Sequence, residues 1–157
     1  MKYICCLIAV EDMDVSRRFY EEVLGQDIRQ DMGENVLFEG GFAIHLKSHF
    51  QNLLDGKAVQ PGGDGYELYF EEDDLDSIVK SLREYGVEFV HEIREQPWKQ
   101  QVVRFHDPDG HLIEIGESME HVAYRLSLEG RNIAEISRIT YLSCPAVARA
   151  ISVFRGE

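Results

Sequence analysis

The chain has 157 residues, of which 44% are apolar and 29% charged, and its formal net charge is −13. This length suffices for one well-buried domain or two small modules that share a core. No apolar run approaches the ~18 residues of a membrane span, and the acidic balance opposes nucleic acid while favouring cationic ligands or metal ions. The three cysteines form no spaced framework, so we expect a cytoplasmic protein in a reducing compartment.

The charge is distributed unevenly along the chain. Residues 1–117 hold 11 of the 16 Lys and Arg and 25 of the 29 Asp and Glu, a net charge of −14, whereas residues 118–157 have a net charge of +1. This step predicts a boundary near residue 117, with a main domain over 1–117 and a separate tail over 118–157.

Two segments of the main domain repeat one pattern. Residues 4–25 and 67–86 each contain an apolar strand, an acidic turn, an amphipathic helix and a terminal glycine. Asp12 or Asp14 can cap the first helix and Asp74 the second, because a side-chain oxygen there accepts hydrogen bonds from the backbone amides that have no partner within the helix. We therefore expect two equivalent modules.

Short strands follow each predicted helix. They are "NVLFEG" and "GFAIHLKS" in the first half and "EFVHEI", "VVRFHD" and "HLIEIG" in the second. The pairs Gly40-Gly41 and Asp109-Gly110 occupy the expected equivalent hairpin turns, in which Gly41 corresponds to Gly110. Each half is thus β-α-β-β with a possible extra strand. The modules would span about 1–50 and 66–117, joined by a linker over 51–65 that contains glycine and proline.

Four polar positions coincide when the modules are superposed. Alignment of the helix caps places Cys5 on Glu67, and alignment of the hairpin glycines places His45 on Glu114. If the two sheets curve together, these positions lie on central strands that face one another. Imidazole and carboxylate suit a divalent ion such as Zn, Ni, Mn or Fe, and three ligands would leave positions open for water or substrate. Such an ion can polarise a carbonyl, and a spare carboxylate can move a proton.

The segments "VEDMDVSRRFYEEVLG" (10–25) and "DPDGHLIEI" (107–115) resemble the signatures of the vicinal oxygen chelate superfamily, which includes glyoxalase I, extradiol dioxygenases and bleomycin-resistance proteins. The resemblance covers residues 2–117. It implies an α+β fold in which two βαβββ modules form a curved mixed β-sheet around a cleft, here followed by an α-helical tail. It further implies a small-molecule ligand and a homodimer.

For function, the resemblance implies a glyoxalase-like lyase or isomerase with a divalent metal held by His45, Glu67, Glu114 and Cys5, and Glu114 as the catalytic base. Relatives commonly have His at the position of Cys5, which could instead pack as a small apolar side chain. His45 and Glu114 could also lie on the solvated face of a half-buried strand. The main alternative function is a metal-free protein of the bleomycin-resistance type that sequesters a cationic drug or metabolite.

Further candidates could contact substrate. Trp98, beside Gln100, could stack on a flat or cationic ligand, or could simply anchor a hairpin. Arg104 and His106 alternate along one strand and could meet an anionic group, although such residues are more often solvated. We expect His111, which borders a turn, to lie at the surface.

The tail contains three predicted helices. They cover Met119–Leu128, ending at Gly130, then Ile133–Ile139, and a third segment capped by Ser143. The spacing resembles a helix-turn-helix, which would make the chain a ligand-sensing regulator. The acidic charge makes nucleic acid binding the weaker interpretation. A tail that packs on the sheet, caps the cleft or joins two subunits is favoured.

Overall fold

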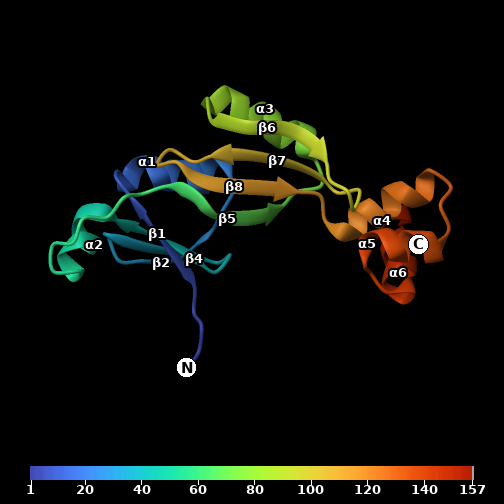
Figure 1. Cartoon of the computed structure of the whole chain (residues 1–157), viewed down its shortest axis with the longest axis horizontal. Coiled ribbons are helices and arrows are strands. Elements are labelled where there is room, and N and C mark those ends of the chain that lie inside the picture. Colours follow the sequence, from blue (N-terminus) through green and yellow to red (C-terminus); the bar gives the residue numbers. More distant parts are fainter. Residues whose placement is uncertain (157) are drawn as a thin grey trace. The chain divides into compact units, whose positions relative to one another are not determined.

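The computed structural model describes residues 1–156, which form an α+β fold with two four-stranded mixed sheets and six α-helices (Figure 1). The first module contains β1 (Cys6–Val10), α1 (Met13–Arg18), a π-helical turn η1 (Phe19–Val23), β2 (Ile28–Asp31), β3 (Asn35–Phe38) and β4 (Phe42–Leu46). The second contains β5 (Gly63–Glu71), α3 (Leu75–Tyr85), β6 (Glu88–Glu95), β7 (Gln101–His106) and β8 (His111–Gly116). The predicted pair of βαβββ modules is confirmed.

In the first sheet the strand order is β1-β4-β3-β2. β1 and β4 are parallel, so the chain needs a crossover, which α1 and η1 provide. Asp12 caps the start of this helix, because its carboxylate accepts hydrogen bonds from the backbone amides of Asp14 at 2.9 Å and Val15 at 3.1 Å. On the interior strand β4, His45 lies opposite Ala9 of β1 and Asn35 of β3.

The second sheet repeats the topology of the first, with the order β5-β8-β7-β6. Asp74 caps α3 by accepting the Ser77 amide at 3.1 Å, and Gly86 follows the helix at φ +90°. Both features agree with the sequence prediction. Glu114 in β8 therefore occupies the same place in its sheet as His45 does in β4.

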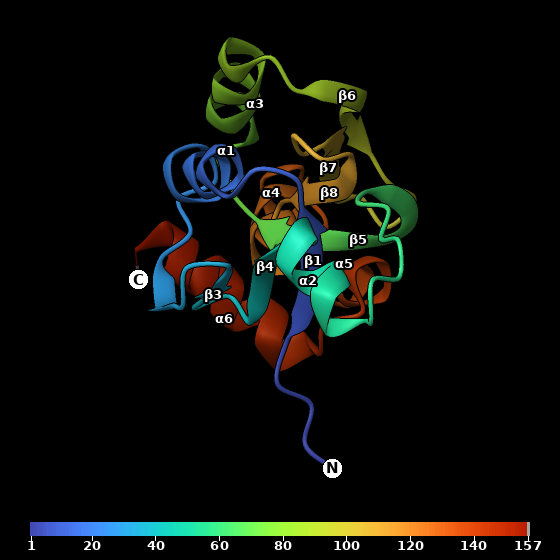
Figure 2. The same ribbon diagram turned by 90° about the vertical axis from the view of Figure 1, so that its left-hand side faces the viewer.

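A short helix, α2 (Lys47–Leu53), spans the end of the predicted first module and the first three residues of the predicted linker. It follows β4 directly and packs against β4 and β1, as Figure 2 shows. A helix of seven residues is too short to be stable by itself, so its stability depends on this packing. It is also too short for the sequence to show a clear helical period. The helix ends before Gly56, which has φ +80°.

The chain divides into two compact units, which we describe separately. The first comprises residues 1–68, 81–88 and 105–113, and the second comprises 69–80, 89–104 and the chain from 114 onward. The predicted domain boundary near residue 117 stays a prediction. Within residues 1–156 no helix is long and apolar enough to cross a lipid bilayer.

The tail forms three helices, α4 (Met119–Leu128), α5 (Ile133–Thr140) and α6 (Cys144–Arg155), which lie together at the C-terminal end of the chain (Figure 1). The predicted helices are thus confirmed. Their shared apolar core consists of Val122, Ala123, Leu126, Ile136, Val147 and Ala150. Because every tail helix contributes to this core, the three helices stabilise one another.

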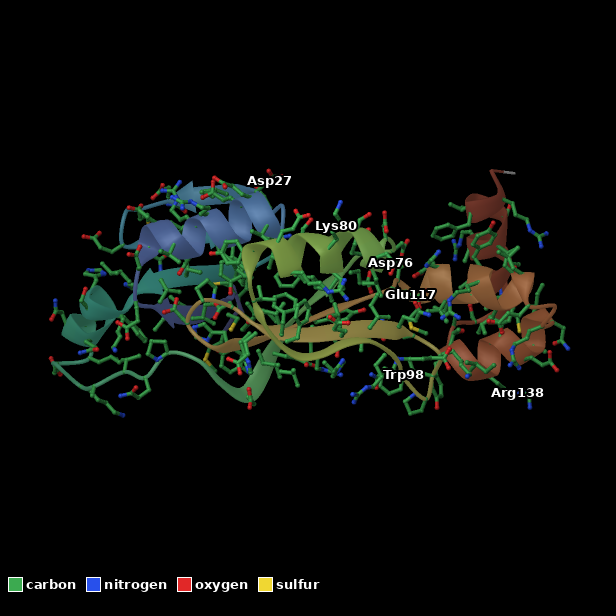
Figure 3. All side chains as sticks on the ribbon, turned by 90° about the horizontal axis from the view of Figure 1, so that it is seen from above. Asp27, Asp76, Lys80, Trp98, Glu117 and Arg138 are labelled. Atoms are coloured by element: carbon green, nitrogen blue, oxygen red, sulfur yellow. The ribbon has the colours of Figure 1, made fainter. Side chains whose placement is uncertain are left out.

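A buried ion pair attaches α4 to the second sheet. Glu117, labelled in Figure 3, is 2% exposed and precedes α4. Its carboxylate accepts hydrogen bonds from Nε and Nη2 of Arg125, each at 3.0 Å, and from the backbone amide of Gln101 at 2.7 Å. The Glu117 carboxylate raises the pKa of Arg125. The sequence pattern did not single out Glu117, because its partner Arg125 lies eight residues further along the chain, on α4.

Candidate functional site

His45 is buried, and both of its ring nitrogens have partners. Asn35 Nδ2 donates to Nδ1 of His45 at 3.1 Å, so the ring proton lies on Nε2, which donates to Nδ1 of His49 at 2.8 Å. Phe50 lies against the imidazole with ring centroids 5.2 Å apart. Burial lowers the pKa of His45, and the neighbouring His49 lowers it further. The interpretation of His45 as a solvated residue is wrong.

Glu114 is also buried, with 5% of its surface exposed, and its carboxylate forms an ion pair with Arg104 of the neighbouring strand β7. Nη1 of Arg104 additionally lies 3.4 Å from Nε2 of His91. The His91 Nδ1–H donates to the Glu92 carbonyl at 2.8 Å, so Nε2 accepts. The charge of Glu114 is therefore compensated within the second unit.

Two residues of the predicted metal set, His45 and Glu114, have protein partners within their own units. Glu67 is exposed and Cys5 half-buried in the first unit, whereas Glu114 belongs to the second. The ring nitrogens of His45 and the Glu114 carboxylate already have protein partners. Among residues 1–156, no group of three or more His, Cys, Asp and Glu side chains could hold an ion. Metal binding by this set stays a prediction.

Trp98 and Gln100 belong to one hydrogen-bond network at the turn between β6 and β7, where Figure 3 labels Trp98. The indole Nε1 donates to Gln100 Oε1 at 2.8 Å. Gln100 Nε2 donates to the Tyr69 hydroxyl at 2.8 Å and to the Glu117 carbonyl at 2.7 Å. These bonds satisfy the buried carboxamide, so its role in substrate binding stays a prediction, as does that of Trp98, which is 38% exposed.

The other two predicted substrate contacts also have partners. Arg104 pairs with Glu114, and His106 Nε2 lies 2.9 Å from the Asp64 carboxylate. Both basic groups therefore face carboxylates of the chain itself, and contact with an anionic substrate stays a prediction.

A cavity of about 290 Å³ lies in the first unit, between β1, the end of α2 and the start of β5. The residues that line it are mostly apolar: Cys6, Leu7, Ile8, Ala9, Phe50, Val59, Gln60, Pro61, Gly62, Tyr66 and His111. Small-molecule sites commonly combine an apolar wall with a few convergent polar groups. Here Tyr66 and His111 supply such groups.

The position of His111 fixes its tautomer. The side chain is 2% exposed, and Nε2 lies 2.8 Å from the carbonyl oxygen of Ala9. A carbonyl only accepts, so Nε2 carries the proton and Nδ1 is an acceptor. The Tyr66 hydroxyl and, at 3.2 Å, the Gly62 amide both contact Nδ1 as donors. The expectation of a surface histidine is wrong.

A buried carboxylate supports His111 from its backbone side. Asp107 accepts the His111 amide at 2.8 Å and the Asp109 amide at 3.0 Å. The Tyr20 hydroxyl donates to Asp107 at 2.8 Å. Burial raises the pKa of Asp107 and raises that of Tyr20 well above its ordinary value, so Tyr20 stays a donor. The turn that precedes β8 is thus fixed by hydrogen bonds.

Burial, with a smaller effect of Asp107 and Cys6, raises the pKa of Tyr66 to about 12. A folded-state pKa above the unfolded value of about 10 stabilises the fold below pH 10, and this stability is lost as the pH rises toward 12. Spectrophotometric titration of tyrosinate should therefore show a late step, to which Tyr20 also contributes, and Tyr66→Phe should lower its amplitude by that of one tyrosine. Tyr141→Phe, at an 88% exposed position, should leave that step in place. Retention of the full amplitude of the late step in Tyr66→Phe would contradict the assignment.

The sequence contains a signal for this pair in the alternation of its strands. In "HLIEIG", strand alternation places His111 on the same face as Ile113 and Ile115, which are buried. In "GYELYF", Tyr66 shares a face with Leu68, which is also buried. Proximity to a turn suggested exposure for His111, but the strand period was the better guide.

Comparison with known proteins agrees with this topology. The family model described as a glyoxalase-like domain matches residues 3–120. The protein named Glyoxylase I 4 from Arabidopsis thaliana is 31% identical over 118 residues, and the match spans 69% of this chain and 66% of that protein. Most of the α4–α6 tail lies beyond the family match.

Solved structures resemble the same part of the chain. A protein of unknown function from Agrobacterium tumefaciens is 39% identical with a TM-score of 0.68, covering 75% of this chain and 94% of its own. A glyoxalase/bleomycin resistance protein/dioxygenase superfamily member from Sphaerobacter thermophilus is 28% identical with a TM-score of 0.56, covering 75% and 98%. A lactoylglutathione lyase from Agrobacterium tumefaciens shares the fold at 20% identity and a TM-score of 0.58, covering 74% and 93%. The chain therefore belongs to the glyoxalase-like domain family.

Proposed function

We propose that the chain binds a small, largely apolar molecule that carries a hydrogen-bond donor, in the cavity beside β1, without a resident metal ion. The observation that carries this proposal is the Tyr66–His111 pair. Because the Tyr66 O–H is directed to His111 Nδ1, the hydroxyl oxygen offers its lone pairs to a donor in the cavity. The apolar residues around it favour a ligand whose remaining surface is apolar.

Phenol is a suitable first probe, because it combines one donor with an apolar ring. Equilibrium dialysis should give saturable binding at one site in the wild-type protein. Cys6→Phe would fill the cavity and should abolish binding, whereas Cys5→Phe changes a neighbouring half-buried residue outside the lining and should retain it. Equal binding by both variants, or none by the wild type, would overturn the proposal.

A metal-dependent glyoxalase-like lyase is the second candidate, because the 31% identity to Glyoxylase I 4 favours it. Elemental analysis of protein purified without an affinity tag separates the two. We expect substoichiometric metal after soaking with Zn, Ni, Mn and Fe(II), with no difference in His45→Ala or Glu114→Gln. Near-stoichiometric metal that falls in both variants would establish the second candidate instead.

The location of the protein, its oligomeric state and the role of its tail are also proposals. Cys5, Cys6 and Cys144 are free thiols, which is in keeping with a cytoplasmic location. Homodimerisation stays a prediction that sedimentation equilibrium can check. The regulatory interpretation of the tail requires a mobility shift of DNA by the full-length chain at low salt, and absence of that shift would remove it.

A further inference from the structure

The Tyr66–His111 pair has the connectivity of a proton relay as well as of a binding site. His111 is buried, is anchored through Nε2–H to the Ala9 carbonyl at 2.8 Å, and presents an unprotonated Nδ1 to Tyr66. Tyr66 is 39% exposed and lines the cavity. The phenol therefore lies between the cavity and a nitrogen that can accept a proton.

We propose that Tyr66 and His111 together remove the proton from an acidic hydroxyl, phenolic or enolic, of a ligand bound in the cavity. This inference rests on the proposed function. It adds an acid–base activity that needs no metal, and it defines the ligand by the group that ionises.

The transfer is balanced in atoms and charge. The O–H bond of the ligand breaks as its proton moves to Tyr66 Oη, and the Tyr66 O–H bond breaks as that proton moves to His111 Nδ1. The products are a ligand oxyanion and an imidazolium whose Nε2–H remains on the Ala9 carbonyl, while the hydrogen bond from the Gly62 amide to Nδ1, 3.2 Å long before the transfer, is given up. No electron is transferred to or from another reactant, and Tyr66 ends as a neutral phenol.

Two features of the first unit favour this transfer. The Asp107 carboxylate accepts a hydrogen bond from the backbone amide of His111 at 2.8 Å and so helps to hold the residue that receives the proton. In addition, burial opposes ionisation of Tyr66, whose pKa is raised to about 12. Tyr66 therefore gives up its proton only while it receives another, which is the behaviour that a relay requires.

The probe for this inference is 4-nitrophenol, whose absorbance distinguishes the phenol from the phenolate. For bound ligand we expect the ratio of phenolate to phenol to rise roughly tenfold over that of free ligand at the same pH, equivalent to one pKa unit. Tyr66→Phe should lose this increase, and His111→Gln should lose it while keeping the Tyr66 hydroxyl. Tyr141→Phe is the matched control and should behave as wild type.

Each outcome decides the matter. Binding with an unchanged phenolate ratio, or with the same increase in Tyr66→Phe, would overturn the relay and leave the proposed function intact. Absence of binding would overturn both. If His111→Gln fails to fold, Tyr66→Phe still decides, and the nitrogen-15 spectrum of the imidazoles supplies a second test. The relay requires a neutral His111 protonated at Nε2, and a proton on Nδ1 in the free protein would contradict it.

Discussion

Arg104→Met should lower the free energy of unfolding by about 3–5 kcal/mol, because it leaves the Glu114 carboxylate buried and unpaired. Methionine keeps the aliphatic volume of arginine, so the loss measures the charge rather than the packing. Chemical denaturation of the single variants Arg104→Met and Glu114→Gln and of the double variant gives a double-mutant cycle. The double variant should recover most of the stability, since both charges are then absent.

Arg94→Met is the matched control, because Arg94 is an exposed arginine on β6. Its replacement should change stability by no more than about 0.5 kcal/mol. The cycle also tests how Glu114 is neutralised. If Arg104→Met were as stable as wild type and contained bound metal, Glu114 would be a metal ligand rather than the partner of Arg104.

Gly62→Ala should destabilise the first unit by roughly 3 kcal/mol and abolish binding in the cavity. Gly62 has φ +80°, and a Cβ there would lie 2.5 Å from the Asp109 carbonyl oxygen and 2.8 Å from that of Gly110. Both contacts are with backbone, which cannot rotate away. The backbone at Gly62 would have to move away from the turn between β7 and β8. This movement would break the 2.9 Å hydrogen bond from the Gly63 amide to the Gly110 carbonyl.

Gly56→Ala isolates the steric contribution to this effect. Gly56 also has φ +80° but nothing lies within 4 Å of the position that its Cβ would take. Alanine there should cost only about 1 kcal/mol, the cost of the left-handed conformation. Equal stability losses at the two positions in thermal denaturation would show that backbone strain, and not the close approach of the linker to the turn, governs the effect.

The repeat was predictable because its signals are local. Asp12 and Asp74 cap their helices through amides two or three residues away, so a short window of sequence contains both partners. The tail helices were predictable for the same reason, since Ser143 caps α6 within its first turn. Helix α2 was not, because its stability comes from packing against β1 and β4.

The candidate site depends on contacts between residues far apart in the sequence. His45 and Glu114 were correctly singled out as polar residues in apolar strands, and both are buried. Their partners could not be deduced in the same way. Arg104 reaches Glu114 across neighbouring strands, and Tyr66 reaches His111 across 45 residues. Pairing of this kind depends on strand register, which the sequence pattern leaves open.

The central claim is that a ligand occupies the cavity beside β1, and a titration of the isotope-labelled protein with phenol, followed by amide NMR, tests it most directly. The account predicts saturable shifts of the amides of Gly62, Tyr66 and His111, which line the cavity, and no comparable shift at Arg138 in the tail. Saturable shifts confined to the tail, or no shifts at all, would contradict it.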